Sequence, residues 1–343
     1  MTNEPTPMKH PFRLWPGLLL VLLCTAQAAT LRAQSAWRHN AGHIFGTTYH
    51  ITYEYGHDLG DSILAELHKV DNSLSMFNAA STISKINRNE PVRPDTMFMS
   101  VFRLSQEVSA TTGGAFDITV SPLVNLWGFG FKKQGEATRA RVDSLLPLVD
   151  YRKVRYSGGR IVKADPRMML DCSAVAKGYG SDCVARLFDR CGIRNYLVEI
   201  GGEIVAKGRN STGGLWRIGV ETPRDSHEET NDRPAAVLTL TGMGMATSGN
   251  YRNYYYKGRR KYAHTIDPHT GRPVRHTLLS STVIAADCAT ADAYATAFMV
   301  LGLRKAKTLL ARHPELQAYF IYSDKKGKNA VWCSPRLKSM IRP

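Results

Sequence analysis

The segment YAHTIDPHTGRPV, residues 262–274, carries side chains that could move a proton. His264 is followed three positions later by Asp267, and the turn residues Pro268 and Gly271 come next. An imidazole with an unperturbed pKa of about 6.5 can accept a proton near neutral pH. His264 is therefore a candidate for proton transfer, at a strand end that the following turn would hold in place.

A lysine lies in the first turn of a helix predicted within DCSAVAKGYGSD, residues 171–182. The macrodipole is positive at this end of a helix, so a cation there is unfavourable unless an anion accompanies it. Lys177 and the backbone N–H groups could together hold a phosphate. Considered alone, Lys177 pointing into water is the simpler interpretation. The adjacent small residues Ser173, Ala174 and Gly178 allow a ligand to approach closely and favour the anion site.

The segment TADAYATAFMVLG, residues 290–302, predicts a second helix start with oxygen ligands. Thr290 is expected to cap the helix, with Asp292 in its first turn and Thr296 four residues on, along the same face. A carboxylate, a hydroxyl and backbone carbonyls suit Mg²⁺ or Ca²⁺ better than zinc. In the alternative interpretation, Asp292 complements the helix dipole and Thr296 bonds back within the helix. When Asp292 or Thr296 is considered alone, this alternative is the better explanation.

Two further segments permit a ligand without requiring one. EIGGEI, residues 199–204, has a glycine pair between strands, where either a tight turn or a ligand lying against the backbone fits. TGGAFDITVSPLVNLWGFG, residues 112–130, sets three aromatic side chains around Asp117. Aromatic side chains can stack on a ring system, although they more often belong to the core.

The elements that must position these residues follow from hydrophobic periodicity and turn residues. Strands are predicted at residues 43–55, 151–156, 160–163, 168–170, 196–200, 204–208, 216–221, 236–242, 318–322 and 330–333. Helices are predicted to start at caps Asp61, Ser81, Asp95 and Thr290, and also over residues 138–146, 174–190 and 304–312. The fold class is therefore mixed α/β (α+β), with helices packed on a largely antiparallel sheet meander in a single large domain.

The N-terminal residues are typical of an export signal. Lys9 and Arg13 precede the apolar run of residues 14–29, which is too short to span a bilayer and is followed by small residues. We expect residues 1–34 to be a signal peptide, with cleavage after Ala28 or, alternatively, near Ser35. The rest of the chain, residues 35–343, is then exported to the periplasm.

Cys24 within this run raises the alternative of a lipid anchor on the membrane. The bulky Leu23 precedes it where lipidation signals have a small residue, so simple cleavage is preferred. Five cysteines follow the signal, an odd count without CxxC pairs, which indicates neither a disulfide framework nor a zinc site. One disulfide bond among these five cysteines is compatible with this pattern.

The net charge of +16 favours acidic partners such as phospholipid headgroups or phosphorylated small molecules. Export and the lack of a recognition motif make nucleic acid the poorest of these partners. A generally basic, solvated surface explains the same charge equally well.

Together and in this order, the motifs resemble those of the ApbE family of FAD:protein FMN transferases. The resemblance runs from about Phe45 to the final strand. It rests on FGTTYHI, LSMFNAASTISKIN, TGGAFDITVSPLVNLWGF, DCSAVAKGYGSD, YLVEIGGEI, ATSGNYRNYY, HTIDPHTGRPV and ADAYATAFMVLG. The chain departs from common family residues at Phe45, Phe77, Ser173, Ala174, Glu199 and Asn250. The residues on which the chemistry depends are retained.

The resemblance implies a reaction on FAD as substrate. The FAD diphosphate is cleaved, FMN is joined by a phosphoester to a threonine or serine of another protein, and AMP leaves. His264 would accept the proton of the attacking hydroxyl. The acceptors implied are flavoprotein domains of membrane-bound redox pumps and reductases.

The resemblance also implies the binding residues. Mg²⁺ would be held by Asp292, Thr296, the carbonyl of Ala174 and Ala295, with Lys177 as a fixed cation beside the diphosphate. Phe45 and Phe77 would line the ring pocket. The remaining flavin nucleotide contacts would come from Ala115, Phe116, Asp117, Asp171 and the Ile266 backbone.

Three other functions compete with this one: an exported flavin-binding or storage protein, an FAD diphosphatase that uses water as nucleophile, and a polyanion-binding surface protein.

Overall fold

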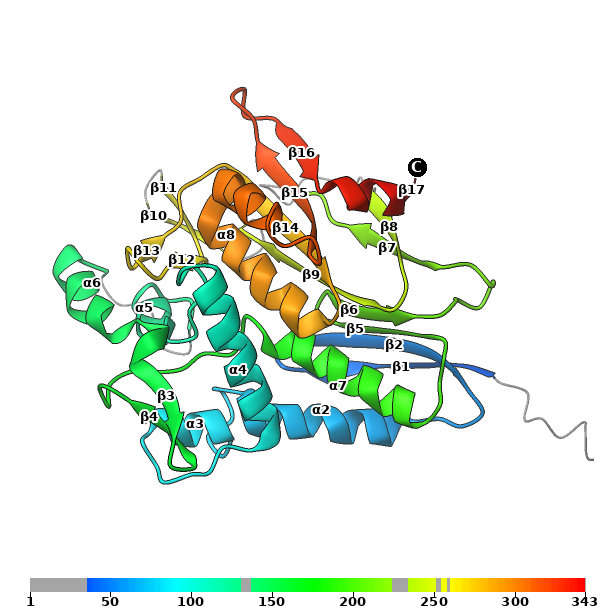
Figure 1. Cartoon of the computed structure of the whole chain (residues 1–343), viewed down its shortest axis with the longest axis horizontal. Coiled ribbons are helices and arrows are strands. Elements are labelled where there is room, and N and C mark those ends of the chain that lie inside the picture. Colours follow the sequence, from blue (N-terminus) through cyan, green and yellow to red (C-terminus); the bar gives the residue numbers. More distant parts are fainter. Residues whose placement is uncertain (1–35, 131–136, 224–233, 251–253, 258–259, 343) are drawn as a thin grey trace, which may run out of the picture.

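The computed structural model in Figure 1 describes residues 36–130, 137–223, 234–250, 254–257 and 260–342, with only the backbone for residues 254–262. The predicted signal peptide, including Cys24, lies outside the described residues. In the described part of the chain, no helix has both the length and the apolar character needed to cross a membrane.

The main sheet contains strands from both the N-terminal and the C-terminal part of the described chain. Its strands are β1 (Ala36–Ile44), β2 (Thr47–Tyr55), β5 (Tyr196–Ile200), β6 (Glu203–Lys207), β9 (Met243–Gly249), β14 (Leu278–Ala285), β15 (Gln317–Ser323) and β16 (Asn329–Cys333), which lie side by side in this order. Neighbouring strands are antiparallel throughout. The predicted fold class is confirmed.

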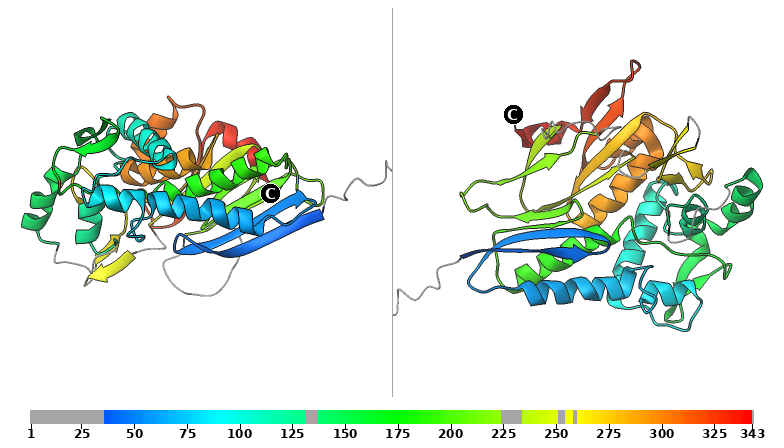
Figure 2. Two further views of the ribbon diagram at one scale, coloured as in Figure 1. Left: turned by 90° about the horizontal axis from the view of Figure 1, so that it is seen from below. Right: turned by 180° about the vertical axis from the view of Figure 1, so that it is seen from behind.

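Helices cover one face of this sheet, as Figures 1 and 2 show. The described helices are α2 (Gly60–Leu74), α3 (Thr82–Asn87), α4 (Thr96–Thr111), α5 (Ser121–Leu126), α6 (Arg139–Leu145), α7 (Ala176–Arg190) and α8 (Cys288–Leu310). Of these, α7 and α8 lie against the strands, α2 packs on α7 and α4 on α8, whereas α3, α5 and α6 lie beside the sheet. Alternate strand residues such as Ala246, Val283 and Phe320 point towards these helices and are buried among them. Burial of this apolar surface is the main force that holds the two layers together.

A smaller sheet covers the opposite face. It consists of β7 (Trp216–Val220), β8 (Ala236–Leu240) and β17 (Ile341–Arg342). Its apolar side chains pack on outward-facing residues of the main sheet, including Met245, Ile284 and Ile321. Two strands of the predicted meander thus leave the main sheet, because its second face is apolar as well and must also be covered.

The predicted helix caps are partly confirmed. Ser81 and Asp95 accept hydrogen bonds from the N–H groups of Ser84 and Phe98, as a cap should. The Asp61 cap is wrong, because α2 begins one residue earlier and Asp61 lies inside its first turn.

The Thr290 cap is also wrong. The Asp287 side chain caps α8 and accepts a 2.8 Å hydrogen bond from the Thr290 N–H, so Asp292 lies one turn deeper than predicted. The two helices predicted here are two segments of α8, which Gly302 interrupts with a φ of 71°.

Short hairpins complete the described chain: β3 (Val154–Ser157) with β4 (Arg160–Lys163), β10 (Tyr254–Lys257) with β11 (Arg260–Ala263), and β12 (Ile266–Asp267) with β13 (Arg272–Pro273). The strand predicted at residues 168–170 is wrong, and residues 43–55 form two strands joined at Phe45 and Gly46.

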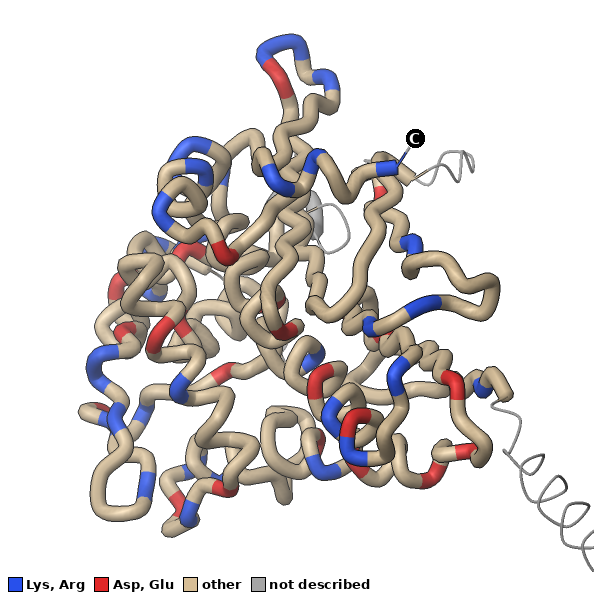
Figure 3. The backbone as a smooth tube through the Cα atoms, turned by 45° about the vertical axis from the view of Figure 1, so that its right-hand side comes forward, with Lys and Arg blue, Asp and Glu red and all other residues tan. Residues whose placement is uncertain are grey.

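The positive charge is dispersed. Figure 3 shows lysine and arginine on helices, loops and hairpins in many parts of the molecule, which agrees with a generally basic, solvated surface. The five described cysteines are free thiols, and Cys172, Cys183 and Cys288 are buried.

Candidate active site

The starts of α7 and α8 meet at close range and bring the two predicted helix-start sites together. Gly178 allows this approach, since a Cβ there would collide with the backbone carbonyl of Cys288. The Gly178 N–H donates a 3.1 Å hydrogen bond to Oδ2 of Asp292, although the two residues are 114 positions apart. The predicted lysine and carboxylate therefore belong to one site.

Lys177 lies between two buried carboxylates in this site. Its Nζ is 3.2 Å from Oε1 of Glu203 and 3.9 Å from Oδ2 of Asp292. The carboxylate side chains are 5% and 3% exposed, whereas the lysine side chain is 28% exposed. Two carboxylates thus anchor the ammonium group, while part of the lysine side chain stays exposed and lines a pocket.

The opposite charges in this cluster stabilise each other's ionised forms. Burial alone would lower the pKa of Lys177, but the carboxylates of Asp292 and Glu203 outweigh it and hold this pKa above its ordinary value. Burial raises the pKa of Asp292, and Lys177 and the Gly178 N–H oppose that rise. Lys177 is therefore a permanent cation at neutral pH.

Two of the donors expected for a metal, Asp292 and Thr296, lie on the same helix. Thr296 follows Asp292 by about one turn of α8, and its Oγ1 is 3.1 Å from Oγ of Ser248 on β9. Ala295 is fully buried between them, and Ala174 is half-buried just before α7.

These donors fit Mg²⁺ shared with a ligand. Among the described residues, no three His, Cys, Asp or Glu side chains converge as a protein-only metal site would need. One carboxylate with neutral oxygens matches Mg²⁺, which proteins commonly bind through one or two carboxylates plus substrate phosphates.

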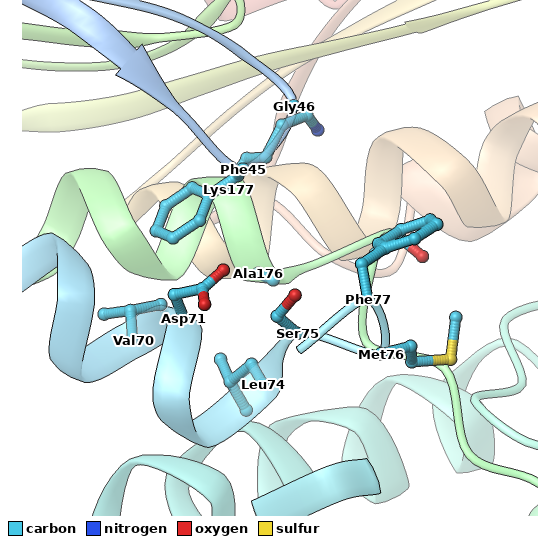
Figure 4. Close-up of a pocket in the computed structure, with 11 residues that line it drawn as sticks. Phe45, Gly46, Val70, Asp71, Leu74, Ser75, Met76, Phe77, Ala176 and Lys177 are labelled. Atoms are coloured by element: carbon cyan, nitrogen blue, oxygen red, sulfur yellow. The ribbon is translucent and has the colours of Figure 1, made fainter. Parts of the chain in front are cut away.

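A pocket of about 400 Å³ opens beside Lys177. Phe45, Phe77 and Lys177 all line it, together with Val70, Leu74 and Met76. Figure 4 shows the Phe45 and Phe77 rings on opposite sides of the pocket, with Asp71 and Ser75 between them. Phe77 is 76% exposed and lines the pocket, so a ligand bound there would cover its apolar surface.

Phe45 reaches the pocket through an uncommon backbone conformation. It occupies the turn between β1 and β2 with a φ of 53°, and Gly180 on α7 leaves room for its ring. The ring therefore lies against the same helix that carries Lys177.

The aromatic segment joins the site through the backbone. The Asp171 N–H donates a 2.7 Å bond to the carbonyl of Ile118, which places Asp117 near Asp171. Burial raises the pKa of Asp117, and bonds from Thr119 and the Tyr151 N–H oppose this rise.

The side chains of Ala115 and Phe116 are buried, so a flavin nucleotide would meet chiefly the backbone there. Burial raises the pKa of Asp171, whose carboxylate accepts a hydrogen bond from the Ser173 N–H.

His264 directly follows β11 and is half-buried, with its ring centroid 6.3 Å from that of Phe129. The next residue, Thr265, donates a 2.6 Å hydrogen bond to Oδ1 of Asn250. Asn250 directly follows β9, the strand that presents Ser248 to Thr296. The segment after His264 is thus joined to the end of β9, the strand whose Ser248 contacts Thr296. Ile266 is buried against α5.

Glu203 and Asp182 were not predicted as site residues from the sequence. Glu203 is the nearer carboxylate to Lys177, and its place directly after the glycine pair was the available signal. The Asp182 carboxylate accepts 2.9 Å hydrogen bonds from the N–H groups of Cys288 and Ala289, joining α7 to α8. Burial raises the pKa of Asp182 to about 7.

Known proteins share this sequence and fold. The sequence profile of the ApbE family matches residues 45–320. The FAD:protein FMN transferase of Klebsiella pneumoniae (strain 342) is 36% identical over 288 residues, covering 81% of each chain. That of Haemophilus influenzae is 34% identical over 337 residues, covering 92% of this chain and 94% of the relative.

Solved structures agree with these relatives. The flavin transferase ApbE from Vibrio cholerae superposes with a TM-score of 0.80 at 32% identity, covering 89% of this chain and 99% of that one. The fold and the relatives together define a transferase. The chain belongs to the ApbE family.

Proposed function

We propose that this chain transfers the FMN moiety of FAD to a threonine or serine hydroxyl of an acceptor flavoprotein, depends on Mg²⁺ and releases AMP. The observation that carries the proposal is the position of Lys177, anchored by Glu203 and Asp292 beside a pocket with a phenylalanine ring on each of two opposite sides. A flavin ring between these phenylalanines would direct the diphosphate towards the ammonium group. The names of the relatives support the same substrate.

The chain's own residues would bind and orient the diphosphate. In phosphoryl transfer, the protein mainly positions the reacting groups and neutralises charge on the non-bridging oxygens. Lys177 supplies a fixed positive charge for this purpose. Asp292, Thr296 and the carbonyl of Ala174, with Ala295 beside them, would hold Mg²⁺, which when bound stabilises charge on the diphosphate and the leaving AMP.

His264 would accept the proton of the acceptor hydroxyl. The hydroxyl oxygen forms the new bond to the phosphorus of the FMN moiety, and the phosphoanhydride bond breaks with its electron pair leaving on AMP. The Thr265–Asn250 hydrogen bond fixes the strand end that carries the imidazole. General-base assistance of this kind contributes about 10²–10⁴-fold to a rate.

We also propose that the mature protein acts in the periplasm. The acceptors would be flavoprotein domains of membrane-bound redox complexes. An exported enzyme with these partners agrees with the signal predicted at residues 1–34.

The test combines the purified protein, FAD, Mg²⁺ and an acceptor domain, and follows covalently bound, fluorescent FMN on the acceptor. His264→Ala should reduce labelling at least 10²-fold while FAD still binds, because the imidazole contributes to the reaction rather than to affinity. His39→Ala is the matched control, since this exposed histidine lies on the edge strand β1, where its Nδ1 is 2.9 Å from Oγ1 of Thr52. Labelling by His264→Ala at the wild-type rate would refute the assignment.

The same assay separates the competing functions. EDTA should stop transfer, whereas a storage protein would keep most of its FAD affinity. Free FMN with an unlabelled acceptor would indicate a diphosphatase instead.

A further inference from the structure

The turn between β5 and β6 lies directly against the stem of Lys177. It consists of Gly201 and Gly202, with φ values of 64° and 100°. A Cβ built on Gly201 would lie 3.3 Å from Cδ of Lys177 and 2.8 Å from Cγ2 of Thr47. The backbone of this turn is therefore the wall that limits where the lysine stem can lie.

Glu199 holds this turn from its other side. Its Oε1 accepts a 2.6 Å hydrogen bond from the Gly202 N–H, and its Oε2 is 2.7 Å from Nδ1 of His50 on β2. The side chain of Glu199 is 21% exposed and that of His50 is 66% exposed. The Glu199 carboxylate is thus partly shielded, and the bond to the backbone is its inner contact.

The same hairpin also holds the lysine head group. Glu203, the first residue of β6, has its Oε1 3.2 Å from Nζ of Lys177, and its carbonyl accepts a 3.0 Å bond from Ser181 on α7. The Gly201 N–H donates to the carbonyl of Thr48. Movement of the turn would therefore displace both the wall along the stem and the acceptor at its end.

We propose that Glu199 is a positioning residue for Lys177. Two consecutive glycines have wide conformational freedom, which a charge-assisted hydrogen bond to the Gly202 N–H restricts to one arrangement. With that arrangement fixed, the ammonium group is directed at the bound anion. This inference rests on the proposed function only for the identity of the anion, the diphosphate of FAD.

His50 has a lesser part in this arrangement. An exposed ion pair contributes little free energy, because water screens it and two side chains must be ordered. We therefore assign the effect to the Glu199–Gly202 hydrogen bond, and the two contributions can be separated by mutation.

The first experiment compares Glu199→Ala, Glu199→Gln and His50→Ala with the wild type. It measures the dissociation constant of FAD by flavin fluorescence, kcat and KM for labelling, and Tm. Glu199→Ala should lower kcat/KM for FAD about tenfold, the effect of one lost hydrogen bond to a charged group. Glu199→Gln keeps an acceptor for the Gly202 N–H and should stay within about threefold of the wild type. His50→Ala should resemble Glu199→Gln.

Wild-type kcat/KM in Glu199→Ala would overturn the proposal, and so would equal losses in Glu199→Ala and Glu199→Gln. The proposal would also be contradicted if His50→Ala lost as much kcat/KM as Glu199→Ala and both variants showed the same fall in Tm. If the wild type labels no acceptor, the proposed function fails, while the FAD dissociation constants still test the positioning role.

A second pair of variants tests the wall itself. Gly201→Ala and Gly242→Ala impose the same left-handed strain, since their φ values are 64° and 66°. A Cβ on Gly242 meets nothing within 4 Å, whereas one on Gly201 meets the lysine stem. Gly201→Ala should weaken FAD binding and Gly242→Ala should not. Equal FAD affinities in the two variants would overturn the proposal.

Discussion

The α7–α8 junction and the segment that carries His264 are the two halves of the site proposed above, and they are built in different ways. At the junction, backbones approach so closely that Gly178 and Gly244 have no room for a Cβ against Cys288. At the His264 end, polar side chains make the connections, such as Thr265 to Asn250 and Trp127 Nε1 to the carbonyl of Gly271 at 2.8 Å.

This difference indicates how each half should respond to substitution. A close-packed backbone cannot accommodate added atoms without moving a whole helix. A side-chain hydrogen bond can be lost for about 1 kcal/mol while the chain keeps its course. An added methyl group at the anion-binding half should therefore abolish labelling. Loss of one side-chain hydrogen bond at the proton-accepting half should only lower the labelling rate.

Gly178→Ala should have the largest effect. Alanine normally stabilises a helix interior by about 1 kcal/mol relative to glycine, so destabilisation here would reverse the usual sign. We expect Tm to fall and labelling to be lost, because α7 and α8 must separate. Gly214→Ala is the control, since its Cβ would meet nothing closer than 3.6 Å. Similar Tm values for the two variants would show that the junction is looser than its geometry indicates.

Lys177→Met should come next, with labelling reduced about 10²–10³-fold. It also leaves Asp292 and Glu203 buried without the ammonium group. Buried carboxylates of this kind have folded-state pKa values above the unfolded ones, so the folded state binds more protons and the variant should gain stability as pH falls. Urea unfolding at pH 8 and pH 5.5 measures this gain. Lys69→Met, in an exposed pair with Glu66, should show none.

Asp182→Asn should change the pH dependence of stability. Burial raises the pKa of Asp182 to about 7, above its unfolded value, so wild-type stability should fall as pH rises from about 4 towards 7. Asparagine removes that contribution but also weakens one of the two bonds to α8. Unfolding midpoints across this range should therefore decline less steeply in the variant. Parallel curves would contradict the assignment.

Thr265→Val should have the smallest effect of this series. It removes the 2.6 Å bond to Asn250 and should lower kcat about threefold to tenfold, with FAD binding unchanged. Thr241→Val, which removes an exposed bond to the carbonyl of Gly208, is the control. A loss of FAD affinity in Thr265→Val would show that the two halves are coupled more tightly than proposed.

Much of the local structure was predictable. The caps Ser81 and Asp95 and the strand at residues 196–200 depend on neighbouring residues, and all three are confirmed. The Thr290 prediction failed because Asp287, three residues earlier, is an equally good cap, and the sequence alone does not choose between them.

Parts of the site were predictable in the same sense. Lys177 was identifiable from its residue type at an unfavourable helix end, and Phe77 from the resemblance of its segment to a family motif. Glu203 and Asp182 were not, since a buried carboxylate acquires its role only from the group that the fold places beside it.

The sequence by itself determined which residues could act and on which kind of element each would lie, because capping, periodicity and dipole effects operate within a few residues. Only the tertiary structure decided that Lys177, Glu203 and Asp292 share one site. Their proximity depends on strand register and on helix packing between distant segments, and neither is encoded in any single stretch of the chain.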